Sequence, residues 1–192
     1  MDFSELLQRR RTIRRFAQRP VADADLRALL EAARLASSAA NLQPLRYVVA
    51  RTPQLVAQLL PLTAWAARVQ PRRNPVLGES APAAFIAVTA PADAHPVWTQ
   101  ADAGAAIQSI EFAATDRGLG CCWLGAIQRE PIAELLQLPP DRQLLYLVAV
   151  GYPDEQPVHE DAPSPDRLSY YLDENDRLHV PKLTADQNAV WK

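Results

Sequence analysis

Five arginines crowd a seven-residue stretch near the start of the chain. Residues 9–15 read Arg-Arg-Arg-Thr-Ile-Arg-Arg, although the whole chain has a formal net charge of -2. So many like charges repel one another unless an anion lies among them, and the planar, forked guanidinium matches a phosphate well. The Thr12 hydroxyl and nearby backbone N–H groups can supply further donors. The stretch therefore predicts a phosphate site, with a solvated face or a nucleic-acid contact as the alternatives.

The overall composition is that of an ordinary globular protein. The chain has 192 residues, of which 48% are hydrophobic and 22% charged, which favours one domain with a substantial core. No run of about 18 apolar residues occurs, so we expect no membrane span. The acidic start and the two adjacent cysteines favour the cytoplasm. The net charge gives no general attraction to nucleic acid, and we expect no nucleic-acid partner.

Hydrophobic spacing predicts alternating helices and strands. Helical spacing of leucine and alanine follows a capping Asp23, and short apolar runs rich in β-branched residues indicate strands. We expect helices at 24–36, 53–68 with a break near Pro61, 99–117 and 131–136, and strands at 45–50, 83–90, 121–127 and 144–150. The run at 83–90 is apolar throughout, as in a strand buried on both faces. The order predicts a sheet layered with helices.

Residues 154–192 differ in kind from the rest. They are rich in proline and acidic residues and contain no long apolar run. Residues 169–172 and 177–180 flank the polar sequence Asp173-Glu174-Asn175-Asp176, which predicts a hairpin. Because this segment cannot form a core of its own, we expect it to lie along the main domain or along a partner subunit.

Several other polar or reactive residues have plain structural interpretations. Cys121 and Cys122 lie in an apolar strand, where packing is favoured over a redox role. The three histidines are too scattered for a metal site, and we expect none. Asp102 is interpreted as a cap or interface residue, with proton donation as the alternative. Trp65, Trp98 and Trp123 suggest packing, and Arg72-Arg73-Asn74 a solvated loop, although pocket-wall and ligand-contact roles remain open.

Four separated motifs together resemble the flavin-dependent nitroreductase family. The family's Arg-Arg-Ser-x-Arg-x-Phe is similar to residues 10–16, and its Pro-Ser-x-x-Asn-x-Gln-Pro-Trp to residues 37–45. Its Asp-x-Gly-x-Ala-x-Gln resembles residues 102–108, and its Gly-Leu-Gly-x-Cys-Trp-x-Gly resembles residues 118–125. Each motif alone is weak, but four in the family's order over residues 5–153 are specific. No Gly-x-Gly-x-x-Gly stretch occurs, which argues against a Rossmann dinucleotide site.

The resemblance implies a fold, an assembly and a cofactor. The implied fold is α+β of the nitroreductase type, with a central, mainly antiparallel sheet flanked by helices, in an intertwined homodimer. Residues 1–153 would form the FMN-binding domain, and residues 154–192 a C-terminal extension packing on that domain or on the partner subunit. FMN would be bound at the subunit interface, in two sites each built from both chains.

The motif positions carry over to specific residues. The phosphate and the pyrimidine edge of FMN would be met by the arginine stretch and by one lysine of the extension, namely Arg10, Arg11, Thr12, Arg14 and Lys182. The partner chain would bring to the ring Ser37, Ser38, Ala39 and Asn41, with Gln43 fixing their loop. The backbone of Leu124, Gly125 and Ala126 would face the ring. Three departures from the usual pattern are Ser37 for proline, Leu45 for tryptophan, and Leu183 where an arginine is common.

The implied activity is that of an oxidoreductase with ping-pong kinetics. NAD(P)H would reduce FMN, and a nitroaromatic, a quinone or a similar electron-poor acceptor would then take its place. The flavin performs the chemistry and the protein positions it, so no catalytic side chain is expected. Two alternatives stay open. One is a same-fold enzyme of other specificity, such as a reductive dehalogenase or an enoate-type reductase, and the other is a non-catalytic FMN-binding protein.

Overall fold

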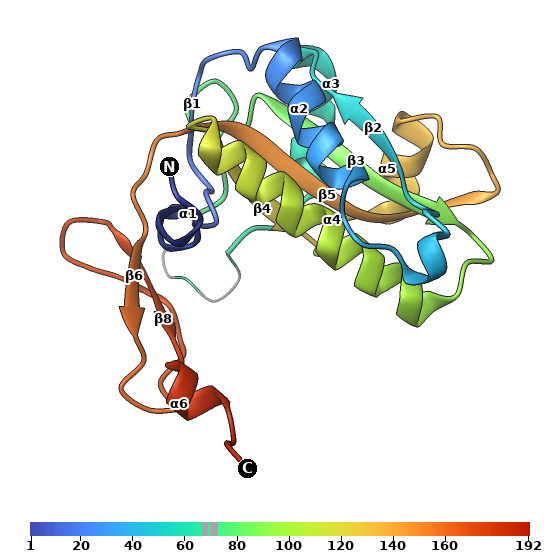
Figure 1. Cartoon of the computed structure of the whole chain (residues 1–192). Helices are drawn as coiled ribbons and strands as arrows, with labels where there is room; N and C mark the ends of the chain where they lie inside the picture. Colours follow the sequence, from blue (N-terminus) through green and yellow to red (C-terminus); the bar gives the residue numbers. More distant parts are fainter. Residues whose placement is uncertain (67–68, 70–72) are drawn as a thin grey trace.

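A five-stranded antiparallel sheet forms the centre of the molecule. The structure is a computed structural model of the chain, and it describes residues 1–66, 69 and 73–192 (Figure 1). The strands are β1 (Phe16–Ala17), β2 (Arg46–Ala50), β3 (Ala84–Pro91), β4 (Gly120–Leu124) and β5 (Arg142–Pro153). Strand β5 pairs with β3, with β4 and, at its end, with β1, while β2 pairs with β3. The antiparallel sheet expected from the resemblance is confirmed.

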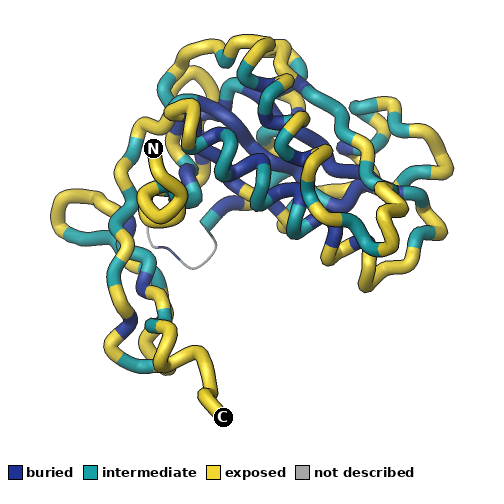
Figure 2. The backbone as a smooth tube through the Cα atoms, in the orientation of Figure 1, coloured by how far each residue is buried: buried dark blue, intermediate teal, exposed yellow. Residues whose placement is uncertain are grey.

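Helices cover both faces of this sheet. Helices α2 (Asp23–Arg34) and α4 (Pro96–Asp116) pack together on one face, against Ile86 and Val88 of β3. The other face carries α3 (Pro53–Leu59) and α5 (Arg129–Leu135), against Phe85 and Ala87. Successive residues of β3 thus enter different cores, which is why its sequence is apolar throughout. The buried residues lie along the middle of the molecule in Figure 2.

The remaining N-terminal helix is α1 (Phe3–Arg9), whose Phe3 ring meets Phe112 of α4 edge to face at 5.8 Å between centroids. Two short 3-10 helices, η1 (Ala39–Asn41) and η2 (Leu60–Leu62), follow α2 and α3. In the part of the chain that the structure describes, no helix is long and apolar enough to cross a membrane.

Several expected boundaries were wrong, each for a local reason. The expected helix 53–68 ends at Leu59, and the break expected near Pro61 is found, because Pro61 lies in η2; residues 67 and 68 lie outside the described part. The long helix begins at Pro96, because proline suits the first turn, and it ends before Gly118, whose φ of 69° is left-handed. The expected strand 121–127 stops at Leu124. Asp23 is the first residue of α2 and not its cap, which is Ala22.

The C-terminal extension forms a small sheet of its own. Its strands are β6 (Val158–Asp161), β7 (Tyr171–Leu172) and β8 (Leu178–Lys182), and α6 (Ala185–Asn188) follows. The expected hairpin is the antiparallel pair β7 and β8, but β6, which pairs in parallel with β8, was not expected. Figure 1 shows the extension projecting from the main domain, so in a single chain most of it does not lie along that domain. The domain boundary at residue 153 stays a prediction.

Candidate functional site

The arginine segment, residues 10–15, lies against the beginning of β4. It follows α1, and its backbone meets the strand where the Ile13 N–H donates to the Cys121 carbonyl at 2.9 Å. Thr12 bridges to the same cysteine. This close approach needs a glycine at position 120, because a Cβ there would lie 2.5 Å from Cγ1 of Ile13. The segment is therefore fixed to the sheet at its centre.

The side chains of Arg10 and Arg11 have different electrostatic surroundings. Arg10 donates to Oε2 of the buried Glu111 on α4 at 3.3 Å. Burial raises the pKa of Glu111, and the Arg10 charge partly offsets that rise. Burial lowers the pKa of Arg11, and the neighbouring Arg10 charge lowers it further. Among the described residues no carboxylate pairs with Arg11, which donates only to the Arg10 carbonyl.

The next two arginines meet a buried acidic group. The backbone N–H groups of Arg14 and Arg15 both donate to the Glu155 carboxylate, which also binds Arg73. Arg73 has only 8% of its surface exposed, so the interpretation of this position as a solvated loop was wrong. Its neighbour Arg72 lies outside the described residues. The Arg14 guanidinium lies 5.8 Å from the ring centroid of Tyr170 in the extension.

The loop from Ser37 to Gln43 is attached by hydrogen bonds to the N-terminal half of α4, whereas Glu111 lies in its C-terminal half. Asp102 accepts hydrogen bonds from Ser38 Oγ at 2.6 Å and from the Ala39 N–H at 2.9 Å. Ser38 Oγ in turn accepts from the Gln43 N–H at 2.9 Å, and the Gln43 side chain donates to Asn41. Asp102 lies inside α4, whose N-cap is His95, so its interpretation as a helix cap was wrong; its carboxylate instead anchors this loop, which Gln43 closes.

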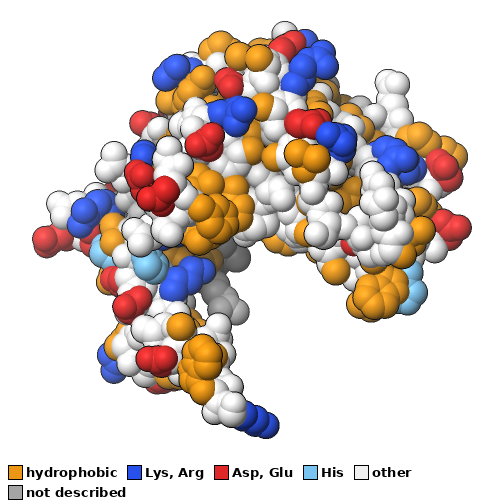
Figure 3. All heavy atoms as spheres, in the orientation of Figure 1, with side chains coloured by type: hydrophobic (Ala, Val, Ile, Leu, Met, Phe, Trp, Pro, Cys, Tyr) orange, Lys and Arg blue, Asp and Glu red, His pale blue; other side chains and the backbone are white. Residues whose placement is uncertain are grey.

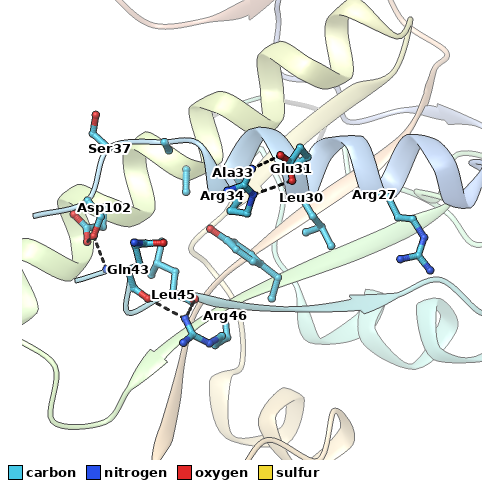
Figure 4. A pocket seen from close by; sticks show the side chains of 14 residues that line it. Arg27, Leu30, Glu31, Ala33, Arg34, Ser37, Gln43, Leu45, Arg46 and Asp102 are labelled. Carbon is cyan, nitrogen blue, oxygen red and sulfur yellow. Dashed lines mark hydrogen bonds and ion pairs between the residues drawn. The ribbon is translucent and has the colours of Figure 1, made fainter. Parts of the chain in front are cut away.

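A cavity of about 490 Å³ lies beside this loop, between α2, β2 and α4. Figure 4 shows Arg27, Leu30, Arg34, Ser37, Gln43, Leu45, Arg46 and Asp102 around it, with Arg34 paired to Glu31. The arginine segment contributes nothing to its walls. Apolar surface from α2 and β2 and exposed guanidinium groups at its rim make it suitable for a ligand or chain segment that is partly apolar.

The turn after β4 exposes backbone donors. Leu124 is buried, whereas Gly125 and Ala126 are exposed. In the described part of the chain, the carbonyls of these two residues accept hydrogen bonds from turns and loops. Their N–H groups donate none there. The half-exposed Trp123 ring meets the Tyr146 ring edge to face at 5.1 Å between centroids. The turn can thus offer N–H groups to a planar ligand beside an aromatic wall.

The predicted site residues fall into three places in a single chain. Arg10, Arg11, Thr12 and Arg14 lie along β4, whose end carries Leu124, Gly125 and Ala126. Ser37, Ser38, Ala39, Asn41 and Gln43 attach to α4 at Asp102, nine residues before Glu111, which is roughly 13 Å along a helix. Lys182 ends β8, which runs toward α6 and away from the main domain (Figure 1). One chain alone does not bring the three groups together.

Two residues of this region escaped the sequence analysis. Glu155 follows β5 in a segment that sequence reasoning assigned to the extension, and Glu111 lies inside an apolar helix. An acidic residue on the buried face of a helix is itself a signal, because burying a carboxylate demands a partner. Glu155 offered no such signal, since it lies among many other acidic residues.

The two cysteines are buried, and His179 is paired with acidic side chains. Cys121 and Cys122 are each 3% exposed, and burial is the main reason that the pKa of Cys122 rises to about 12. His179 lies between two carboxylates, with Nδ1 3.0 Å from Glu160 and Nε2 3.2 Å from Asp173. In the part of the chain that is described, no three His, Cys, Asp or Glu side chains are grouped closely enough to hold a metal ion.

Comparison with known proteins identifies relatives that match most of this chain. A protein of Archaeoglobus fulgidus, provisionally named NADH dehydrogenase/NAD(P)H nitroreductase, is 31% identical over 177 residues, covering 85% of this chain and 94% of the relative. A similarly named protein of Methanothermobacter thermautotrophicus is 29% identical over 175 residues, covering 88% of this chain and 86% of that protein.

Solved structures agree with the fold. A nitroreductase of Desulfovibrio desulfuricans, crystallised in complex with FMN, is 28% identical with a TM-score of 0.68, covering 83% of this chain and 91% of that one. A nitroreductase family protein of Clostridium difficile 630 is 20% identical with a TM-score of 0.69, covers 100% of this chain and 99% of its own, and supports the fold alone. The model of the nitroreductase family matches residues 7–152. The chain therefore belongs to the nitroreductase family.

Proposed function

We propose that the protein is an FMN-dependent oxidoreductase that takes electrons from NAD(P)H and passes them to an electron-poor acceptor such as a nitroaromatic or a quinone. One observation carries the proposal most directly. Arg11 is partly buried beside Arg10, no carboxylate among the described residues pairs with it, and its pKa is lowered. An arrangement of this kind is unfavourable until an anion arrives, and the FMN phosphate is a dianion of matching geometry.

We infer that the donor set would serve FMN along its whole length. Arg10, Arg11, Thr12 and Arg14 would together hold the phosphate at one end of the cofactor. The N–H groups at Gly125 and Ala126, next to buried Leu124, would meet the central part of the ring from the end of β4. Bound FMN would supply hydride acceptance and donation. The protein's own groups bind it, orient it and leave space for a second planar molecule.

A homodimer would complete the site. The loop residues Ser37, Ser38, Ala39, Asn41 and Gln43 would come from the partner subunit, and Lys182 would add a positive charge near the phosphate. Large apolar side chains stand exposed near this loop, with Leu42 73%, Leu35 68%, Val97 65% and Trp98 56% exposed. The extension and the main domain enclose a hollowed flank, visible in Figure 3, that a second chain would fill. We propose that residues 154–192 pack there on the partner.

Anaerobic mixing tests the proposal. The purified protein is loaded with FMN, freed of excess flavin by gel filtration and mixed with NADH or NADPH while absorbance near the flavin maximum is followed. Rapid bleaching, followed by recovery of the colour on addition of a quinone or a nitroaromatic compound, is the expected result. A flavin that stays oxidised with both donors contradicts the reductase and supports a non-catalytic FMN-binding protein. Light scattering during the same gel filtration tests the dimer, and a monomeric holoprotein would contradict it.

A further inference from the structure

Glu155 is the acidic group around which the arginine segment is folded. Its side chain is 7% exposed and lies two residues after β5 ends. One carboxylate oxygen, Oε1, accepts hydrogen bonds from the backbone N–H groups of Arg14 and Arg15, the second at 3.2 Å. The other oxygen, Oε2, accepts from Arg73 at 2.6 Å. The three donors come from two segments far apart in the sequence, so Glu155 joins them.

The backbone of the segment has few other fixed points here. Ile13 is held by its N–H bond to Cys121, and Phe16 by its N–H bond to the Ser80 carbonyl at 3.1 Å. Between these points the N–H groups of Arg14 and Arg15 have no strand to pair with, and Glu155 accepts both. Two successive N–H groups on one oxygen orient the two peptide planes on either side of the Arg14 Cα. Those planes set the direction in which the Arg14 side chain leaves the backbone.

The charge of Glu155 has a second consequence. Arg73 is almost fully buried, with 6% of its side chain exposed, and its guanidinium is neutralised by Glu155 and by Asp176 of the β7–β8 turn at 2.7 Å. Asp176 also binds Arg15 at 2.9 Å. Without Glu155, Asp176 would be the remaining described partner of the buried Arg73 charge, beside a segment that already carries four arginines at positions 10, 11, 14 and 15. The segment would then move to reduce the repulsion.

We propose that Glu155 is a positioning residue for the phosphate site, holding the arginine segment in the conformation that presents Arg11 and Arg14 to the phosphorylated end of the cofactor. The proposal rests on the proposed FMN site and deepens it. Glu155 itself does not touch the ligand. It therefore acts on the part of the affinity that comes from the phosphate, and not on binding of the ring.

Comparing FMN with riboflavin, which lacks the phosphate, separates these two parts. Flavin-free wild-type protein, Glu155→Gln and Glu155→Ala are titrated with each flavin, and the quenching of flavin fluorescence gives Kd. The measured quantity is the ratio of Kd for riboflavin to Kd for FMN. We expect Glu155→Ala to lower this ratio at least fivefold while riboflavin affinity changes less than twofold. Glu155→Gln keeps an oxygen for the N–H donors and should lower the ratio less.

Two further variants control for charge and folding. Glu134→Gln makes the same carboxylate-to-amide replacement at an exposed position on α5. It should leave the ratio of the two Kd values as in the wild type. If Glu155→Ala does not fold, Glu155→Gln combined with Arg73→Gln removes both buried charges together and restores neutrality. This double variant should recover most of the ratio that Glu155→Gln alone loses.

Each remaining outcome contradicts the proposal in a recognisable way. Equal losses of FMN and riboflavin affinity in Glu155→Ala would show a merely structural role and overturn it. An unchanged ratio in both Glu155 variants, with a wild type that clearly prefers FMN, would overturn this proposal and leave the proposed function intact. A wild type that binds neither flavin would overturn both.

Discussion

Asp102 and Ser38 are joined by a hydrogen bond of 2.6 Å between Oδ2 and Oγ, although 64 residues separate them in the sequence. The bond connects the rigid helix α4 to a loop in an unusual conformation, since Ala40, Asn41 and Gln43 have φ values of 48°, 53° and 49°. Left-handed backbone is unfavourable for residues other than glycine, by roughly 1–2 kcal/mol each. The loop keeps this shape because the buried Asp102 carboxylate accepts hydrogen bonds from Ser38 and Ala39.

Replacing Asp102 by alanine should therefore destabilise the protein. The change leaves the Ala39 N–H and the Ser38 hydroxyl without their acceptor, and we expect the free energy of unfolding to fall by about 2 kcal/mol. Urea denaturation followed by circular dichroism measures this. Asp93→Asn, an exposed change in the turn before α4, should stay within about 0.5 kcal/mol of the wild type. Equal stability of Asp102→Ala and wild type would mean that the loop does not depend on this anchor.

Two glycine substitutions should act in opposite directions. A Cβ at Gly120 would lie 2.5 Å from Ile13, so Gly120→Ala must push the arginine segment away from β4 and cost roughly 1–3 kcal/mol. A Cβ at Gly104 in α4 would make only an ordinary 3.7 Å contact with Trp123, so Gly104→Ala should stabilise by roughly 0.5–1 kcal/mol. Thermal unfolding of both variants checks this. A destabilised Gly104→Ala, or a tolerated Gly120→Ala, would contradict the packing described.

Arginine substitutions test the proposed phosphate contacts. Arg10→Ala and Arg14→Ala each remove charged donors from the segment, and we expect each to weaken FMN binding by about tenfold, which corresponds to roughly 1.4 kcal/mol. Arg9→Ala is the matched control, because Arg9 lies on α1, is largely exposed and pairs only with Glu5 in the described part of the chain. Equilibrium dialysis against FMN gives all three affinities. If Arg10→Ala and Arg14→Ala retain FMN as well as the wild type does, the phosphate site lies elsewhere.

The extension should respond to pH through His179. A neutral imidazole carries one N–H, yet both ring nitrogens face carboxylates, so the geometry favours the charged ring. The hydrogen bonds to Glu160 and then to Asp173 raise the pKa of His179 above its ordinary value. Because the folded pKa is the higher one, this stabilisation is complete below the ordinary histidine pKa of about 6.5 and is lost as pH rises through the folded value.

Asp173 sets the acidic limit of the pH range in which these contacts stabilise the extension. Hydrogen bonds, first from the Arg177 backbone, lower the pKa of Asp173, so its contribution is lost only as the solution becomes strongly acidic. We therefore expect proteolysis of the extension to be slowest in mildly acidic solution and to accelerate as pH rises past neutrality. His179→Gln should remove that acceleration. Titration of the histidine ring protons by NMR checks the raised pKa, and a value at or below that of an exposed histidine would refute the expected pH dependence.

The adjacent cysteines should be unreactive in the folded protein. Burial raises the pKa of Cys121 well above its ordinary value and that of Cys122 to about 12, so almost no thiolate is present at neutral pH. We expect Ellman's reagent to label neither thiol in the native state and both in guanidinium chloride. Rapid native labelling of either one would contradict the packing interpretation and reopen a redox role.

The sequence by itself determined the family, the alternation of helices and strands, and the uniform burial of β3. These features depend on local periodicity and on short motifs, which are written in consecutive residues. It also marked the arginine segment as a predicted phosphate site through its crowded charges, and assigned the Ser37–Gln43 loop to the predicted site through the family resemblance.

Only the tertiary structure decided which partners these segments have. The contacts of Glu155 with Arg14, Arg15 and Arg73, of Glu111 with Arg10, and of Asp102 with Ser38 join residues tens of positions apart. No local pattern distinguishes Glu155 from the many other acidic residues around it. Its role arises because β5 ends beside the arginine segment, so that this carboxylate accepts from the N–H groups of Arg14 and Arg15 and shares the buried Arg73 guanidinium with Asp176.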